Sequence, residues 1–307
     1  MNEKNFIKIN ELPTKTWNRL AVNFATAAWD KSLETEKCNN VFDFKKSGDQ
    51  AKAIINICDK YSVEKVNVSV AESVSAVLYE IIETFTDSSV KTEVTLGENS
   101  YLKIVQIYKP QNGTALIDSV KAECPAGSTF ENIKLVIGKG NTYSDTRVAL
   151  QGDKSKFKSD IAYFAAKDQK IDFNVAADHF GKDTESGINA AGALKDNANK
   201  IFRGTIDFKN GSSGSVGNEH ETVLMLGDGA VNKTVPLILC AEENVVGNHG
   251  ATIGELDDDT LFYFESRGID KETAENILAR ASLESAARNI DDKEISNDVL
   301  AEIDSLL

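Results

Sequence analysis

One histidine and one cysteine lie close together in a glycine-containing stretch, and both are side chains that bind metals. His249 has Gly247 and Gly250 nearby, which leave an imidazole accessible, and Cys240 lies nine residues upstream. Imidazole and thiolate are borderline-soft ligands that suit iron or zinc. Two ligands do not complete a four-ligand site, so we expect no stable metal in the isolated chain and only transient or shared metal chemistry. The alternative for Cys240 is a small buried residue at a strand end.

Signatures of other chemistry are missing from the sequence. There is neither a P-loop nor a GxGxxG pattern, so we do not expect the chain to bind ATP by itself. No GxSxG nucleophile elbow occurs, and His220 with Glu221 lacks the second histidine of the HExxH motif. His179 and His220 are expected to be structural or solvent-exposed, as most histidines are.

A long β region must position His249 and Cys240. From about Val63 to Val246, short runs alternate with period two, as in Leu102 to Tyr108, and turn clusters separate them. A sandwich, a barrel and a β-solenoid all satisfy this pattern. We favour the solenoid because large aromatics are few and the candidate core positions are small, as a narrow stacked core requires. These small candidates are Ala162, Ala165, Ala176, Ala191 and Gly192.

Both ends of the chain show helical spacing of apolar residues. Residues 14–60 are expected to be partly helical, with apolar positions from Trp17 to Ala28 and again from Ala53 to Ile55. After Gly254 the pattern is helical again, with Asp270 as a plausible N-cap. An apolar stripe follows, made of Ala274, Ile277, Leu278 and Ala281, and a second amphipathic piece runs from Ile295 to Leu307. The stripe either covers the end of the β region or docks a partner.

These patterns divide the chain into three parts. We expect residues 1–62 to form a partly helical N-terminal region, residues 63–254 the β core, and residues 255–307 a C-terminal helical region. The C-terminal part carries 15 acidic and 5 basic residues, and so holds most of the negative charge of the chain.

Charge and cysteine usage exclude several classes of protein. The chain has 34 Lys and Arg against 48 Asp and Glu, a net charge of −14, and no basic cluster of the kind that binds nucleic acid or an anionic membrane. No apolar run is long enough to span a membrane, and the N-terminus lacks the apolar segment of a secretion signal. Four dispersed cysteines without a CxxC pair then indicate free thiols in a reducing cytoplasm.

Two specific motifs follow each other at the end of the β region. They are His249-Gly-Ala-Thr-Ile-Gly254 with Leu256-Asp257, and then Leu261-Phe-Tyr-Phe-Glu-Ser-Arg-Gly-Ile269. With these motifs, residues 202–269 resemble the SufB/SufD family of iron–sulfur cluster assembly proteins. Phe202-Arg-Gly-Thr-Ile206, Leu226-Gly-Asp228, and Thr234-Val-Pro236 leading to Cys240-Ala-Glu-Glu243 support it. Weaker similarity reaches the N-terminus, so the resemblance covers most of the chain.

This resemblance implies a fold, partners and site residues. The implied fold is a right-handed parallel β-helix flanked by N- and C-terminal helical segments. In the family, SufB and SufD pair through their β-helices, and each docks the ABC-type ATPase SufC through its C-terminal helices. The resemblance implies that the docking residues in this chain are Asp270, Ile277, Leu278 and Ala281. His249 matches the histidine that the SufD branch contributes to the cluster-assembly interface. Glu221 lies where the SufB branch has its cysteine, which favours the SufD branch.

The leading hypothesis is a non-catalytic scaffold subunit that supports nascent cluster assembly in the cytoplasm. Its partners would be a SufB-like subunit and a SufC-like ATPase, with a cysteine desulfurase system as the indirect sulfur source and a transient iron–sulfur cluster in the complex. One alternative is a self-pairing scaffold, a homodimer that acts with the ATPase alone. The other is a carbohydrate-active enzyme on a β-helix, which would normally be secreted.

Overall fold

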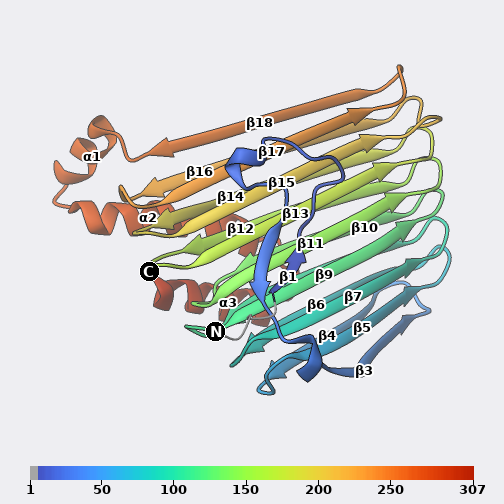
Figure 1. Ribbon diagram of the computed structural model, residues 1–307, viewed down its shortest axis with the longest axis horizontal. Coiled ribbons are helices and arrows are strands. Elements are labelled where there is room, and N and C mark those ends of the chain that lie inside the picture. Colours follow the sequence, from blue (N-terminus) through green and yellow to red (C-terminus); the bar gives the residue numbers. More distant parts are fainter. Residues whose placement is uncertain (1–5) are drawn as a thin grey trace.

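A computed structural model describes residues 6–307. Most of the molecule consists of two eight-stranded β-sheets, each made of parallel strands. Consecutive strands alternate between the two sheets, so each turn of the chain adds one strand to each sheet. The result is a parallel β-solenoid of about eight turns (Figure 1). The even-numbered sheet contains β4 (Asp49–Ile57), β6 (Ser75–Thr84), β8 (Tyr101–Pro110), β10 (Thr129–Val136), β12 (Lys156–Ala165), β14 (Glu185–Lys195), β16 (Val216–Leu226) and β18 (Val246–Glu255). The odd-numbered sheet contains β3 (Thr35–Phe44), β5 (Ser62–Val70), β7 (Ser88–Leu96), β9 (Ala115–Cys124), β11 (Asn141–Leu150), β13 (Lys170–His179), β15 (Asn199–Phe208) and β17 (Val231–Cys240).

The core lies between the two sheets. Each strand pairs with the strand of the previous turn, 26 to 32 residues earlier, so inward positions stack directly above one another. Ala165 belongs to this core, but Ala162 lies on the outer face. Large rings fill much of the interior, with Phe130 stacked on Phe157 at 5.8 Å between centroids. The predicted solenoid is therefore confirmed, although small residues are only part of its packing.

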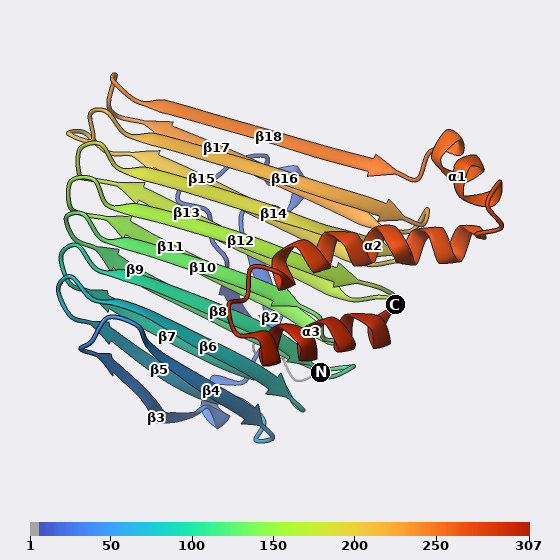
Figure 2. The same ribbon diagram turned by 180° about the vertical axis from the view of Figure 1, so that it is seen from behind.

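Three C-terminal helices follow the last strand of the described chain, and two of them cover the outer face of the even sheet (Figure 2). They are α1 (Asp258–Glu265), α2 (Lys271–Ala287) and α3 (Lys293–Leu306). Asp270 is the N-cap of α2, as predicted, and accepts a hydrogen bond from the amide of Thr273. Leu283 and Val299 pack in one apolar cluster with Val105 of the sheet.

The buried face of α2 differs from the predicted stripe. Ala274, Ala279 and Leu283 are buried, but Ile277 and Ala281 are exposed and Leu278 is half-buried. The helix is rich in alanine on several sides, so the apolar periodicity is compatible with more than one face. Contact with the sheet selects the face that carries Leu283.

The position of Leu283 leads to a stability prediction. Leu283→Ala is expected to lower the free energy of unfolding by about 2–5 kcal/mol, because it removes a fully buried side chain between helix and sheet. The matched change Ile277→Ala, on the exposed face of the same helix, is expected to cost about 0.5 kcal/mol or less. Urea denaturation measures both, and equal costs would contradict the observed packing of α2.

The N-terminal region differs most from the expectation. Residues 14–60 contain only two 3₁₀ turns, η1 (Asn18–Leu20) and η2 (Lys31–Leu33), and Ala53, Ile54 and Ile55 lie in strand β4. Ala53 and Ile55 face the core while Ile54 is exposed, so pairing with β6 divides this continuous apolar run between two faces. The solenoid thus begins at β3, and the expected boundary at residue 63 falls inside it.

A short hairpin precedes the solenoid and lies across the outer face of the odd sheet (Figure 1). Its strands, β1 (Phe6–Ile9) and β2 (Ala25–Ala28), are antiparallel. Asn10 donates hydrogen bonds to Asp172, and the Arg203 side chain bonds both Asp172 and the carbonyl oxygen of Val22. Arg203 is fully buried by this arrangement, which fastens residues 10–23 to β13 and β15.

Candidate functional site

The solenoid ends at an unpaired edge formed by the last strand of each sheet. Within residues 6–307, β18 pairs only with β16, and β17 pairs only with β15. Almost every residue of β18 is exposed. Figure 1 shows this strand at the top of the sheet, with no strand drawn beyond it. The backbone groups along one side of β17 and β18 are therefore available to another molecule.

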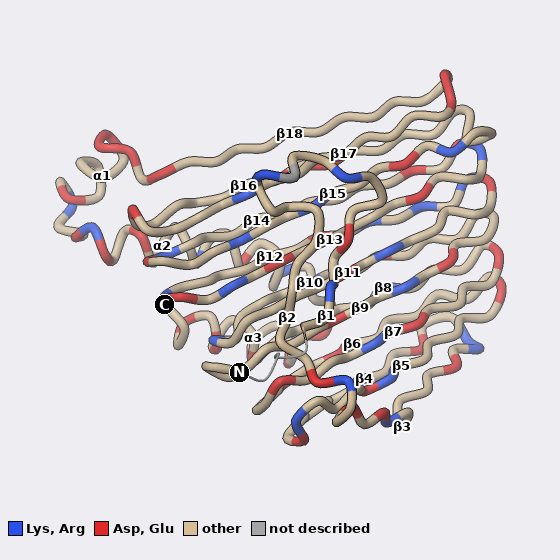
Figure 3. The backbone as a smooth tube through the Cα atoms, in the orientation of Figure 1, with Lys and Arg blue, Asp and Glu red and all other residues tan. Residues whose placement is uncertain are grey.

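The two ends of the solenoid carry very different side chains. At the first turn, β3 has a register irregularity between Lys37 and Asn40 together with several charged residues, and β4 carries Asp49 and Lys52. Bulges and charges of this kind protect an edge from pairing with another chain. By contrast, β18 has no charged residue before Glu255 and β17 has only Lys233 (Figure 3). The edge at β17 and β18 lacks this protection.

His249 lies on the inner face of β18, at the open end. Its neighbour on β16 is Glu219, whose side chain is buried in the solenoid. A Cβ atom on Gly247, two residues away on the same face, would contact Ile238 of the opposite sheet. His249 therefore points toward the solenoid axis, but it is exposed because the described chain forms no further turn above it.

Cys240 lies at the same end but is not opposite His249. The carboxyl group of Glu219 lies against Gly204 of the opposite sheet, and the residues above these two are His249 and Pro236. Cys240 is four residues beyond Pro236, at the end of β17. It is exposed rather than buried, because no turn covers the last strand. All four cysteines lie within the described residues and are free thiols.

A buried polar cluster lies one turn below the open edge. The amine of Lys200 bonds the carboxyl group of Glu221, which also accepts a hydrogen bond from the hydroxyl of Thr234. Lys200 and Glu221 are both completely buried. A second carboxyl group, that of Glu219, is 4% exposed, and its Oε2 has no hydrogen-bond partner among residues 6–307.

Burial governs the protonation of this cluster. Loss of water raises the pKa of Glu219 to about 7, although the nearby Lys200 amine acts in the opposite direction. Burial likewise lowers the pKa of Lys200 well below its ordinary value, and the charge of Glu219 opposes that change. The cluster thus holds two carboxyl groups for one amine.

Glu219 and Lys200 are absent from the residues that the sequence analysis selects. Lys200 and Glu221 are 21 residues apart, and no motif connects them. One signal was available: Glu219 and Glu221 alternate with residues that face outward, so both glutamates fall on the parity of the buried face. Because charged residues are rarely buried, this parity would have identified both glutamates as candidate site residues.

The residues expected to dock a partner belong to α2 and its N-cap, and α2 begins beside α1 on the side where α1 projects beyond the sheets (Figures 1 and 2). Ile277 and Ala281 of α2 are exposed, and Leu278 is half-buried. On α1, Phe262 is 71% exposed and Tyr263 is 55% exposed. These residues leave an apolar surface open to solvent, and α1 does not cover the end of the solenoid.

Across residues 6–307, no group of three or more His, Cys, Asp or Glu side chains is arranged to hold a metal ion. In the same range, none of the helices combines the length and apolar character that crossing a membrane requires.

The sequence of the chain also matches a protein-family model. The model for "SUF system FeS cluster assembly, SufBD core domain" matches residues 53–282, which is well over half of the chain. The chain belongs to the SufBD family. The matched SufBD segment includes most of the solenoid, the open edge and the larger part of α2.

Individual SufBD relatives show the same affiliation. The chain is 29% identical over 188 residues to the iron–sulfur cluster assembly protein SufD of Bacillus subtilis, which covers 61% of this chain and 43% of the relative. It is 23% identical over 221 residues to SufB of the same organism, with 72% and 47% covered. A SufBD family protein of Mycobacterium tuberculosis is 24% identical over 202 residues, with 66% and 24% covered. The matches span less than half the length of each of these relatives.

Proposed function

We propose that this chain is a scaffold subunit of a SUF iron–sulfur cluster assembly complex and pairs through the edge of β17 and β18 with a second SufB/SufD-type chain. The observation that carries the proposal is the contrast between the two ends of the solenoid. A pair of edge strands with few charges, of which β18 is exposed along nearly its whole length, is suited to β-augmentation by another chain, and it places His249 at the junction. The nascent cluster, the cargo of the complex, would form there.

Within the family, we assign the chain to the SufD branch. The greater identity to SufD than to SufB of Bacillus subtilis supports this assignment. Glu221 supports it as well, because it stands where the SufB branch has a cysteine and is engaged by Lys200 and Thr234. A subunit without that cysteine would depend on a SufB-like partner for a thiolate ligand.

The chain itself would not hydrolyse ATP. A SufC-like ABC-type ATPase would supply that activity, and we propose that it docks on the apolar surface around Phe262, Tyr263 and Ile277, which is exposed in the described chain. A cysteine desulfurase system would be the indirect source of sulfur. A cytoplasmic location, expected from the free thiols, stays a prediction.

Co-purification from the native cell tests the partners. Recovery of the chain with both a SufB-like protein and an ATPase would support the proposal. Recovery with an ATPase alone, in a complex with two copies of this chain, would favour the self-pairing scaffold. Recovery with neither would contradict both, and would leave the carbohydrate-active enzyme to be tested by activity on polysaccharides.

His249→Ala tests the cluster-assembly role. The exposed His249 has little packing to lose, so the variant is expected to keep its stability and its partners but reduce cluster formation by the complex to background. His220→Ala is the matched control, because His220 is exposed on the outer face of the neighbouring strand. Anaerobic reconstitution with iron and sulfide, followed by absorption spectroscopy, measures the yield. A normal yield from His249→Ala would refute the role.

A further inference from the structure

Glu219 and His249 are next to each other on the inner face of the even sheet. They are paired residues of the parallel strands β16 and β18, whose backbones lie about 4.8 Å apart, and their side chains project from the same face. Glu219 lies in the buried turn, and His249 lies directly above it in the open one. An imidazole therefore lies one strand above a buried carboxyl group, where the solenoid interior opens to solvent.

The carboxyl group of Glu219 has no ion-pair partner of its own among the described residues, because the nearby Lys200 amine is bonded to Glu221. The pair of Lys200 and Glu221 has no net charge whether the shared proton lies on the amine or on the carboxyl group. The buried carboxyl group of Glu219 is therefore left without a cation. Its Oε2 has no hydrogen-bond donor among residues 6–307. An unpaired carboxylate is costly to bury, and a bound cation would offset that cost.

The opposite sheet leaves room for the carboxyl group. The residue facing Glu219 is Gly204, and a Cβ atom there would lie 2.3 Å from the Glu219 Cδ atom. Above Gly204 lies Pro236, whose side chain has no hydrogen-bonding atom and no metal ligand. Glu219 is thus the potential ligand that the register places beside His249, and Cys240 is farther along β17.

We propose that Glu219 and His249 form a two-ligand half-site for a divalent first-row metal ion such as Fe²⁺. Imidazole and carboxylate together suit this class of ion. Two ligands bind weakly, so the isolated chain would lose the metal during purification, and ligands from the chain paired at β17 and β18 would complete the coordination. The biological use of the half-site rests on the proposed function, but the half-site itself belongs to the isolated chain.

Metal titration of the isolated full-length chain tests the half-site. Co²⁺ under anaerobic conditions is the probe, and binding is followed by its visible absorption. We expect Glu219→Gln and His249→Ala each to weaken binding at least tenfold, and the double variant to be no weaker than the weaker single variant. His220→Ala and Glu243→Gln, which change exposed side chains near the same end, are the controls and should bind like wild type. Unchanged binding by Glu219→Gln would overturn the proposal.

A second measurement needs no variant and therefore does not depend on the folding of Glu219→Gln. Diethylpyrocarbonate modifies accessible imidazoles, and mass spectrometry distinguishes His249 from His220. Saturating Co²⁺ should slow modification of His249 at least fivefold and leave His220 unaffected. Equal rates with and without Co²⁺ would overturn the half-site. Because no partner is present, this failure is distinct from a failure to pair with a SufB-like chain.

Discussion

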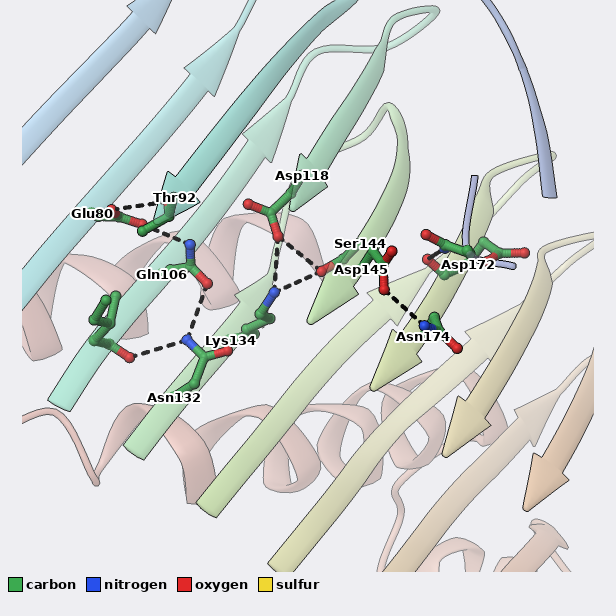
Figure 4. A network of polar contacts seen from close by, with 12 residues as sticks. Glu80, Thr92, Gln106, Asp118, Asn132, Lys134, Ser144, Asp145, Asp172 and Asn174 are labelled. Carbon is green, nitrogen blue, oxygen red and sulfur yellow. Dashed lines mark hydrogen bonds and ion pairs between the residues drawn. The ribbon is translucent and has the colours of Figure 1, made fainter. Parts of the chain in front are cut away.

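Replacing Lys134 with methionine (Lys134→Met) is expected to lower the free energy of unfolding by about 3–5 kcal/mol. Lys134 and Asp118 are both fully buried in the solenoid, with 2.8 Å between Lys134 Nζ and Asp118 Oδ2 (Figure 4). Ser144 Oγ lies 2.7 Å from the same Nζ atom. Methionine fills a similar volume but leaves Asp118 as a buried charge without its cation. Asp118 Oδ1 already has no hydrogen-bond partner within residues 6–307.

The double variant Lys134→Met with Asp118→Leu separates the ion pair from simple packing. Removing both charges removes the unpaired carboxylate, so we expect most of the lost stability to return. Chemical denaturation at pH 7 measures all three proteins. If Lys134→Met and the double variant were equally destabilised, the cost would come from packing around Tyr108, whose ring centroid lies 5.6 Å from Lys134 Nζ, and not from the charge of Asp118.

Replacing Glu80 with glutamine (Glu80→Gln) is expected to change how stability depends on pH. Glu80 is completely buried, and burial raises its pKa to about 7, although a hydrogen bond from Gln106 Nε2 at 2.6 Å acts in the opposite direction (Figure 4). Between pH 4.5 and 7 the folded state therefore binds a proton that the unfolded state has released. Wild type loses stability from this group as pH rises through that window, and none below it.

The expected size of this loss follows from the shift. A pKa raised from 4.5 to about 7 corresponds to about 3 kcal/mol, and glutamine, which does not titrate, avoids it. The stability of Glu80→Gln relative to wild type should therefore increase by about 3 kcal/mol from pH 4 to pH 8. Glu219 has a similar shift and His179 an opposite one, but both are present in the two proteins and cancel in the difference.

Glu83→Gln is the matched control for this pH series. Glu83 lies on the opposite face of the same strand, β6, and is half-buried beside Gln111. Its stability difference from wild type should stay constant within about 0.5 kcal/mol across the range. Urea midpoints at intervals of one pH unit give the curves. A flat difference for Glu80→Gln would mean that Glu80 is ionised in the folded protein, with Lys134 compensating it.

The sequence by itself determined the features that depend on local pattern. Period-two alternation and turn clusters identified the β region, and an aspartate before an apolar helical repeat identified Asp270 as an N-cap. The motif around His249 indicated the SufB/SufD family, which the family match confirms. These signals were readable because each depends on residues within a few positions of one another.

Only the tertiary structure decided which residues meet across turns. Stacking joins positions 26 to 32 residues apart without a repeated motif, so no local pattern places Glu219 beneath His249. Contacts across the core join residues of opposite sheets, and no local pattern places Lys200 against Glu221, 21 residues away. The same reason explains the error at Ala53 to Ile55, where pairing with the next turn converts an apparent helical run into strand β4. Cys240 is exposed because burial in a solenoid requires a turn above, and the described chain forms none beyond β17 and β18.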